Sequence, residues 1–278
     1  MNHVVMFSGG VGSWAAAKRV AGRHGTDNLT LLFTDTLIED EDLYRFLREG
    51  GASVGGKLVT IKDGRDPWQV FFDERFLGNS RRDPCSKILK RQLADAYLNL
   101  FFDPADTTVY VGIDWSEKHR FFGGRGKQGL QRRRAAQGWR YEAPLCEEPY
   151  LDKADMLRML DAEGIDRPEL YEEGFTHNNC GGWCVKAGHA SMALLLVKRR
   201  QRYLRHESKE QDFRKFINAD VGIMTDRRNG ERRPLTMREF RERFEAMSPE
   251  EQKRVLRSSG AGGCGCMLDD PEEEDIFG

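Results

Sequence analysis

The chain has 278 residues, enough for one large α/β domain with an appendage or for two small domains. Lysine plus arginine (44) and aspartate plus glutamate (45) nearly cancel, so the net charge of −1 predicts no partner and only a local cluster can indicate one. No stretch approaches the roughly 20 apolar residues of a membrane span, and the N-terminus lacks a basic segment followed by an apolar one, so we expect a cytoplasmic protein with no membrane partner.

The first predicted elements are a strand at 3–7 and an alanine-rich helix at 14–20, joined by a glycine-rich turn. Glycines let backbone N–H groups converge, and the first helical turn adds unpaired donors and the positive end of its dipole. The pattern therefore predicts an anion cradle, with Ser13 as the helix N-cap; the alternative is an ordinary βα turn. The residues expected to bind a nucleotide here are Ser8, Gly9, Gly10, Gly12 and Ser13.

The turn lacks the lysine that a Walker A loop requires. Its Ser-Gly-Gly-x-x-Ser pattern after a strand resembles the PP-loop of the ATP-pyrophosphatase (adenine nucleotide α-hydrolase-like) superfamily. The resemblance implies that the loop holds the β,γ-pyrophosphate of ATP as the leaving group while the α-phosphate is attacked. Members often carry Lys-Asp or x-Asp where this chain has Val11-Gly12, so a charged group of that pattern is absent.

Two further strands are predicted at 29–34 and 57–61. Asp35 and Thr36 follow the first of them, at the sheet edge where open α/β sheets bind ligands. This Asp-Thr pair with an acidic helix start is similar to the second motif of phosphoadenylyl-sulfate (PAPS) reductases, a branch of the same superfamily. We expect both residues to flank the nucleoside; the alternative for Asp35 is to cap the following helix.

A helix is predicted from about Pro84 to Leu100. Its start resembles the Cys-x-x-x-Leu-Lys segment of the reductase-like branch, in which basic residues face the anionic ligand. Lys87 and Lys90 are therefore candidate anion ligands, or else they belong to the solvated face of a helix.

A fourth strand is predicted at 107–113, and Gly112 near its end is expected to contact the nucleotide. The Gly-Ile-x-x-x-Glu-x-x-Arg spacing that begins there resembles the reductases, which implies that Glu117 and Arg120 organise the substrate pocket. Asp114 and Glu117 are the best carboxylates for Mg²⁺, which triphosphate chemistry needs to offset charge. We take Asp114, Glu117 and Arg120 as the candidate catalytic residues, against the alternative of a capped, solvated loop.

The glycines at 124, 126 and 129 match the dinucleotide fingerprint, but the match does not follow directly on a strand and we reject it. We expect residues 121–134 to form a flexible basic loop, in which residues 125–134 contain too few apolar groups to join the core. Such a loop is a phosphate clamp, a nucleic-acid contact or a solvated lid. The anion-binding candidates in it are Arg125, Arg132 and Arg133.

A fifth strand at 139–145 and a helix at about 151–163 complete an alternation of strands and helices. The pattern predicts an α/β fold with a doubly wound, mostly parallel, Rossmann-like sheet. The Pro-x-Leu-Tyr-x-x-Gly run at 168–174 is again similar to PAPS reductases. Beyond Cys184 we expect a helix to about Tyr203, a turn at 226–230 and helices at 235–247 and 249–257. The expected domains are 1–173 (nucleotide-binding), 174–268 (a helical, cysteine-containing extension) and 269–278 (an acidic, disordered tail).

Two close cysteine pairs flanked by glycine leave room for four thiolates to converge on one ion or cluster. They favour zinc or a [4Fe–4S] cluster; the alternative is unligated thiols in a tight turn. The proposed ligands are Cys180, Cys184, Cys264 and Cys266. Cys85 could join them, and we take Cys146 to be structural.

The resemblance implies a PP-loop, PAPS-reductase-like protein that binds ATP or a related adenine nucleotide with Mg²⁺. It would cleave between the α- and β-phosphates to activate an acceptor or modify a nucleic acid. The reductases use a C-terminal Glu-Cys-Gly-Ile/Leu-His nucleophile, and residues 263–267 lack its glutamate and histidine, which argues against PAPS reduction. Two alternatives remain: a sulfonucleotide reductase acting through Cys264 or Cys266, and a non-catalytic nucleotide-binding subunit of a CRISPR or DNA-modification nucleoprotein complex.

Overall fold

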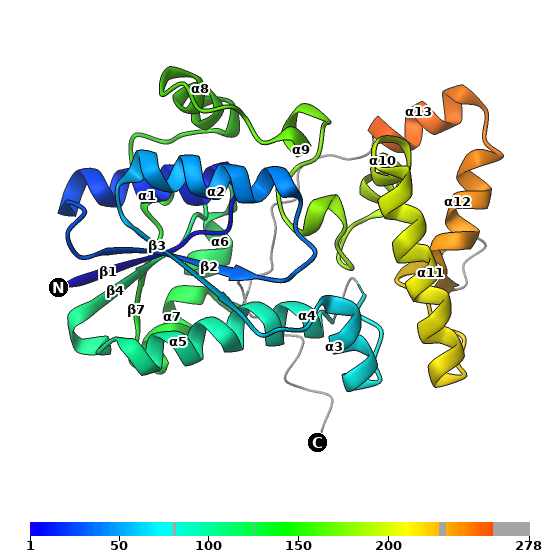
Figure 1. The fold of residues 1–278 in the computed structure, drawn as a ribbon, viewed down its shortest axis with the longest axis horizontal. Helices are drawn as coiled ribbons and strands as arrows, with labels where there is room; N and C mark the ends of the chain where they lie inside the picture. The colour runs from blue at the N-terminus through cyan, green and yellow to red at the C-terminus, as the bar shows by residue number, and fades with distance from the viewer. Residues whose placement is uncertain (80–81, 125, 228–231, 258–278) are drawn as a thin grey trace.

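The computed structural model describes residues 1–79, 82–124, 126–227 and 232–257. Its main sheet has five parallel strands in the order β3-β2-β1-β4-β7, with helices on both faces (Figure 1). The predicted doubly wound α/β fold is therefore confirmed. The strands are β1 (Asn2–Met6), β2 (Leu29–Asp35), β3 (Lys57–Lys62), β4 (Thr107–Tyr110) and β7 (Arg140–Glu142).

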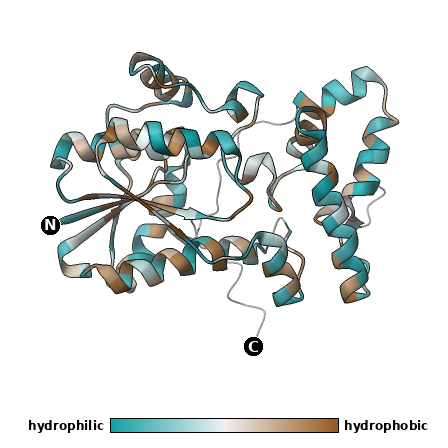
Figure 2. Ribbon diagram, viewed as in Figure 1, coloured by the Kyte–Doolittle hydropathy of each residue, from teal (hydrophilic) through white to brown (hydrophobic). Residues whose placement is uncertain are grey.

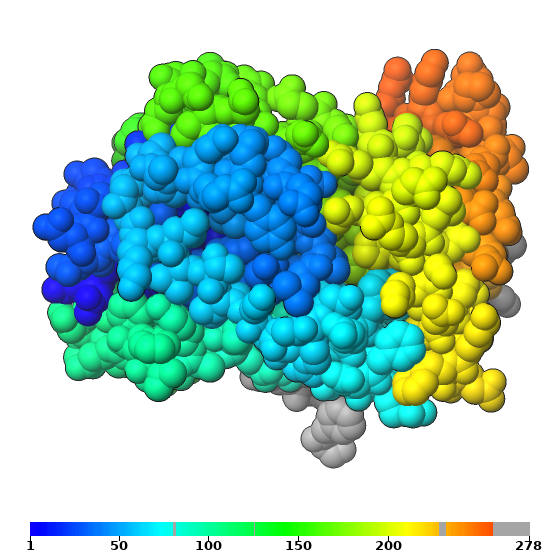
Figure 3. Space-filling model, in the orientation of Figure 1, coloured from blue at the N-terminus to red at the C-terminus, as the bar shows by residue number. Residues whose placement is uncertain are grey.

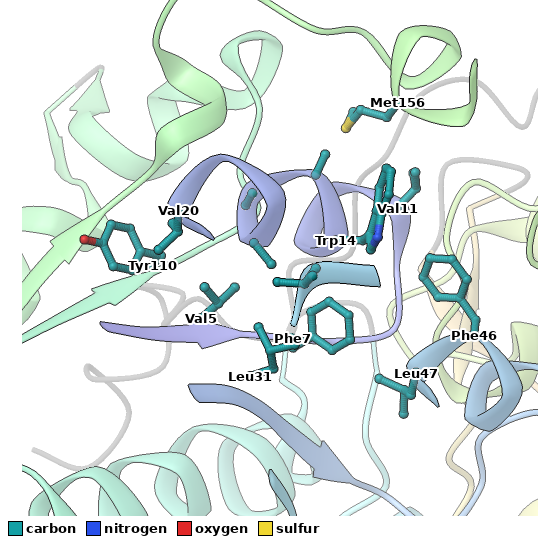
Figure 4. Packing of buried hydrophobic residues seen from close by; sticks show 14 of the residues in the cluster. Val5, Phe7, Val11, Trp14, Val20, Leu31, Phe46, Leu47, Tyr110 and Met156 are labelled. Carbon is teal, nitrogen blue, oxygen red and sulfur yellow. The ribbon is translucent and has the colours of Figure 1, made fainter. Parts of the chain in front are cut away.

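The central strands are buried on both faces, as a parallel sheet between two helical layers requires. Successive side chains of β1 alternate between two hydrophobic clusters: Val5 packs in one and Val4 and Met6 pack in the other. Figure 4 shows the first cluster, and in Figure 2 brown, apolar stretches of the strands meet at the centre of the sheet. The first cluster lies under α1 (Val11–His24), α2 (Glu41–Val54) and α8 (Lys153–Ala162), and the second under α5 (Leu93–Phe101), α6 (Lys118–Phe122) and α7 (Leu130–Ala136).

The helix predicted at 84–100 is present but is not uniformly α-helical. It runs as α4 (Pro84–Ser86), a π-helical segment η1 (Lys87–Gln92) and α5. The exposed Lys87 keeps the predicted solvent contact, but Lys90 is 5% exposed, with its Nζ 3.9 Å from Glu39 Oε1. The alternative that Lys90 belongs to the solvated face of the helix is therefore wrong, and its role as an anion ligand stays a prediction.

A third hydrophobic cluster joins α3 to the helices that follow residue 188. Figure 3 shows α3 and α11 in direct contact. The helix expected to end near Tyr203 breaks at Arg199, a residue held by Glu173 and Glu169, and a new helix continues to Ile217. The elements of this region are α3 (Pro67–Glu74), α9 (Glu169–Glu172), α10 (His189–Lys198), α11 (Arg200–Ile217), the hairpin β8 (Met224–Asp226) and β9 (Arg233–Leu235), α12 (Met237–Glu245) and α13 (Pro249–Arg257).

Among the residues that the structure describes, no helix has both the length and the apolar character needed to cross a membrane.

Short 3₁₀ turns connect several of these elements. The turns are η2 (Pro104–Asp106), η3 (Trp115–Glu117), η4 (Pro144–Cys146) and η5 (Cys180–Gly182).

The basic segment 121–134 is not the predicted loop. It contains the end of α6, a short ribbon of β5 (Gly123–Gly124) and β6 (Lys127–Gln128), and α7. Phe121 and Leu130 are buried and tie it to the core, so the expectation that residues 125–134 stay outside the core is wrong at Leu130. A Cβ on Gly129 would lie 2.2 Å from the backbone oxygen of Phe121, so this glycine serves the close approach of two chain segments rather than a dinucleotide.

Arg134 shows that the arginines of this segment are not equivalent. Its side chain is 5% exposed, and its guanidinium donates to both carboxylate oxygens of Asp95 at 2.9 Å. We expect Arg134→Ala to lower the free energy of unfolding by about 2 kcal/mol, because it removes charge-assisted hydrogen bonds. Arg132→Ala, at an exposed position of the same helix, should change it by less than about 0.5 kcal/mol. Equal effects of the two variants in urea denaturation would contradict this assignment.

Candidate functional site

A cavity of 180 Å³ lies where the strand order of the sheet reverses, between the carboxyl ends of β1 and β4. Such switch points are where open α/β sheets bind ligands, because the connections there leave in opposite directions. Its lining combines the glycine-rich loop, the segment after β4 and a later stretch at 153–179. The polar and glycine residues that line it are Ser8, Gly10, Gly12, Ser13, Gly112, Asp114, Glu117, Arg120, Lys153, Tyr171, Thr176, His177 and Asn179.

Helix α1 starts earlier than predicted and has no serine cap. Gly10 is the N-cap, without a side-chain hydrogen bond, and Ser13 lies in the first turn. The Ser13 Oγ donates to the backbone oxygen of Gly10 at 2.8 Å and accepts from the backbone N–H of Ser8 at 3.1 Å. Ser13 is thus corrected from N-cap to a brace across the loop. The glycine N-cap has no side chain to compete with an anion, although the Val11 N–H donates to the Tyr171 hydroxyl.

Gly9 and Gly10 differ in why they are glycine. Gly9 has a φ of 78°, and a Cβ there would lie 2.8 Å from Leu43 Cγ. A Cβ on Gly10 would instead point at the hydroxyl of Tyr171, at 3.2 Å. Gly9 therefore shapes the loop without lining the cavity, whereas Gly10 leaves the mouth of the helix open.

Gly12 and Gly112 let the end of β4 lie directly against the start of α1. A Cβ on Gly112 would be 2.7 Å from the backbone nitrogen of Ser13, and a Cβ on Gly12 would be 3.1 Å from the backbone oxygen of Gly112. The neighbouring atoms belong to the backbone and cannot move aside as a flexible side chain can. Any side chain at Gly112 must therefore push the end of β4 and the start of α1 apart. This contact between glycines brings the fourth strand to the phosphate loop.

The candidate catalytic residues all line the cavity. Asp114 Oδ1 accepts from the backbone N–H of Ser116 at 2.8 Å and so caps η3. Glu117 Oε1 accepts from the Arg120 guanidinium at 2.7 Å. The Ser116 hydroxyl also donates to Asp114 Oδ1, so both of these hydrogen bonds use Oδ1 and neither involves Oδ2.

Residues 153–179 supply a part of the site that we did not predict. The Lys153 ammonium donates to the backbone oxygen of Thr176 at 2.9 Å and lies 3.9 Å from the centre of the Tyr171 ring. The Tyr171 hydroxyl accepts from the backbone N–H of Val11, the first residue of α1, at 3.2 Å. Two sequence features could have indicated these residues. Tyr171 lies in the Pro-x-Leu-Tyr-x-x-Gly run, and Lys153 is the first residue of a helix, where the helix dipole disfavours a cation.

Two consecutive asparagines join this stretch to the loop. Asn178 is fully buried, and its Nδ2 donates to the backbone oxygen of Gly9 at 2.9 Å. Asn179 is 6% exposed and lines the cavity, and its Oδ1 has no hydrogen-bond partner among the described residues. A buried amide oxygen without a donor is costly, so Asn179 is suited to accept a hydrogen bond from a ligand.

Several predicted ligands do not line the cavity. Asp35 Oδ1 accepts from the backbone N–H of Leu37 at 2.8 Å and from the Tyr44 hydroxyl at 2.9 Å, so it shapes its own turn. The Thr36 hydroxyl donates to Glu39. Lys87, Lys90, Arg132 and Arg133 also lie elsewhere, and Arg125 is outside the described residues.

The four-thiolate site stays a prediction, because Cys264 and Cys266 lie outside the described residues. Cys180 is buried and Cys184 is half-buried, and within the described ranges no cluster of three or more His, Cys, Asp or Glu side chains suits a metal ion. Burial raises the pKa of the Cys146 thiol to about 11, which agrees with a structural cysteine.

No protein-family model and no curated protein matches this chain. Among solved structures, it resembles phosphoadenylyl-sulfate (PAPS) reductase from Candida auris, determined as a phosphate complex. The two share 14% sequence identity over 63% of this chain and 78% of that chain, with a TM-score of 0.41.

Proposed function

We propose that the cavity binds the phosphates of ATP or a related adenine nucleotide, and that the chain catalyses attack on the α-phosphate with release of pyrophosphate. The observation that carries this proposal is the start of α1, which has a glycine N-cap without a capping side chain and opens into a cavity at the switch point of the sheet. Anions bind at such helix ends because unpaired N–H groups and the helix dipole both favour negative charge. The resemblance of the loop to a PP-loop supports the choice of the α–β bond.

In the proposed reaction, a nucleophile on the acceptor attacks the α-phosphorus, and the bond from that phosphorus to the α–β bridging oxygen breaks. Pyrophosphate leaves with the electron pair, and the acceptor carries AMP; with water as acceptor the product is AMP. The Ser8 hydroxyl and the backbone N–H groups of Gly12 and Ser13 in the first turn of α1 would hold the leaving pyrophosphate, while the Ser13 hydroxyl braces the loop.

Asp114 and Glu117 would hold Mg²⁺, because carboxylate oxygens are the ligands it prefers beside phosphates. When bound, Mg²⁺ would offset the charge that develops on the leaving group. Arg120, positioned by Glu117, would contact the acceptor or the α-phosphate. At 180 Å³ the cavity is smaller than the roughly 300 Å³ at which small-molecule sites begin, so it fits the phosphates and leaves the nucleoside at its mouth.

Purified protein should be incubated with Mg²⁺ and ATP labelled at either the α- or the γ-phosphate, and the products resolved. AMP with pyrophosphate supports the proposal, and ADP with phosphate overturns it. Binding without turnover would leave the chain a nucleotide-binding subunit, and the absence of binding would refute the site itself.

Gly10→Asp should abolish ATP binding, lowering affinity by at least about 100-fold, because a carboxylate would enter the space that the phosphates need. Calorimetry with ATP measures this effect. Gly22→Asp, at an exposed position of the same helix with open space around it, is the matched control and should bind like the wild type. Unchanged ATP affinity in Gly10→Asp would rule out the cradle.

A further inference from the structure

Lys153 is the first residue of α8 and lines the cavity, and the groups that its ammonium directly contacts are neutral. Its contacts are the backbone oxygens of Thr176 at 2.9 Å and Phe175 at 3.5 Å and the ring of Tyr171. It forms no ion pair within the described part of the chain. The other cation of the cavity differs, because Arg120 is paired with Glu117 at 2.7 Å.

The position of Lys153 is electrostatically unfavourable. The first turn of a helix repels a cation, and half-burial removes water from the ammonium. Burial lowers the pKa of Lys153 to about 8. A neutral side chain would fill the same space without this cost, so the charge is better explained by an anion that enters the cavity.

The loop itself offers no side-chain cation, because Val11 and Gly12 stand where a charged pair is often found in the PP-loop pattern. Lys153 reaches the same cavity from another helix, beside the start of α1, whose first N–H already contacts Tyr171. We propose that Lys153 is the cationic ligand of the bound phosphates and sets the preference of the site for pyrophosphate-containing ligands. This inference rests on the proposed function and assigns recognition of the negative charge of the phosphates to one residue, Lys153.

Proton uptake on binding is a direct consequence. At pH 8.5 part of the free protein has a neutral Lys153, and a bound pyrophosphate would restore its proton. The ionisable groups around it are Asp152 and Asp155 on α8, Tyr171 and His177 from the next segment, and Asp114, Glu117 and Arg120 across the cavity. Calorimetry in buffers of different ionisation enthalpy at pH 8.5 should show uptake in the wild type that Lys153→Met loses.

The main test compares inorganic pyrophosphate and adenosine as ligands of wild type, Lys153→Met, Lys153→Arg and the control Lys209→Met. Lys153→Met should weaken pyrophosphate binding about 10- to 100-fold, the range expected for lost charge-assisted hydrogen bonds, and should leave adenosine binding unchanged. Lys153→Arg should recover part of the loss. Lys209 is exposed on α11 outside the cavity, so Lys209→Met should match the wild type.

If the wild type binds pyrophosphate and Lys153→Met binds it equally well, the inference fails and the proposed function stands. If the wild type binds neither ATP nor pyrophosphate, the proposed function fails as well. A Lys153→Met protein that does not fold leaves the decision to Lys153→Arg and to proton uptake by the wild type, and the absence of that uptake would overturn the inference.

Discussion

Gly112→Ala should lower the free energy of unfolding by about 3 kcal/mol, at the upper end of the usual cost of overpacking, and abolish pyrophosphate binding. The added Cβ would lie 2.7 Å from the Ser13 nitrogen and 2.8 Å from the Gly12 carbonyl carbon, all backbone. Either β4 or the start of α1 must move, and both form the cavity. Urea denaturation and calorimetry with pyrophosphate measure the two effects.

The matched control for this variant is Gly22→Ala on the exposed part of α1, where an added Cβ meets nothing within 4 Å. This change should stabilise the helix by up to about 1 kcal/mol, because alanine has the higher helix propensity. The same substitution thus has opposite expected signs at the two positions. A Gly112→Ala protein with wild-type stability and pyrophosphate affinity would show that the contact between the glycines does not shape the site.

The sheet and the phosphate loop could be predicted because their signals are local. In β1 and β2 the apolar side chains are contiguous in the sequence, and the glycines of the loop adjoin the strand that positions them. The right-handed connections of parallel sheets then determine the face of the sheet that each helix covers, once the strand order is known. This is why the loop, Gly112 and the residues after β4 were all predicted at one site, and all except Gly9 line one cavity.

The rest of the site depends on contacts between distant parts of the chain. Three lining residues, Lys153, Tyr171 and Asn179, come from the segment that follows β7, far from the phosphate loop in the sequence. Their local sequence does not specify that this segment folds back against the loop. The burial of Arg134 is similar, because it depends on Asp95 from another helix. The predicted start of α1 was wrong for a different reason. From the sequence alone, a serine in the first turn of a helix cannot be distinguished from a serine at the N-cap.

Two of the buried ionisable groups on α11, His206 and Glu210, lie one turn apart in the helical region beyond the sheet. His206 Nδ1 accepts from the Trp68 indole N–H at 2.9 Å, and the His206 ring stacks on Trp183 at 4.1 Å. Burial, assisted by Arg202 and Arg205, lowers the pKa of His206 from 6.5 to about 3. His206 is therefore neutral in the folded protein over most of the acidic range.

Glu210 has the opposite shift. Its carboxylate accepts from the backbone N–H groups of Ile223 at 3.0 Å and Met237 at 2.6 Å, so it joins α11 to the hairpin and to α12. Burial outweighs these hydrogen bonds and raises the pKa of Glu210 from 4.5 to about 7. Below neutral pH the folded protein holds Glu210 protonated, whereas the unfolded chain ionises it down to 4.5.

These shifts act in opposite directions between pH 4.5 and 6.5. For His206 the unfolded state binds the extra proton, so acidification lowers stability by about 1.4 kcal/mol per pH unit. For Glu210 the folded state binds the extra proton, so acidification raises stability at about the same rate. The two contributions cancel in this window, and below pH 4.5 only the loss from His206 continues, until it ends near pH 3.

Single variants should reveal the pH dependence of the free energy of unfolding that each residue contributes. Glu210→Gln removes the gain, so its stability relative to wild type should fall by about 1.4 kcal/mol per unit as the pH drops from 6.5 to 4.5. His206→Asn keeps an acceptor for Trp68 and removes the loss, so relative to wild type its stability should rise at about the same rate. Differences from the wild type, measured by urea denaturation at half-unit steps of pH, cancel the other carboxylates. The double variant should show no slope relative to wild type, and slopes of the same sign in the two single variants would refute the assigned protonation states.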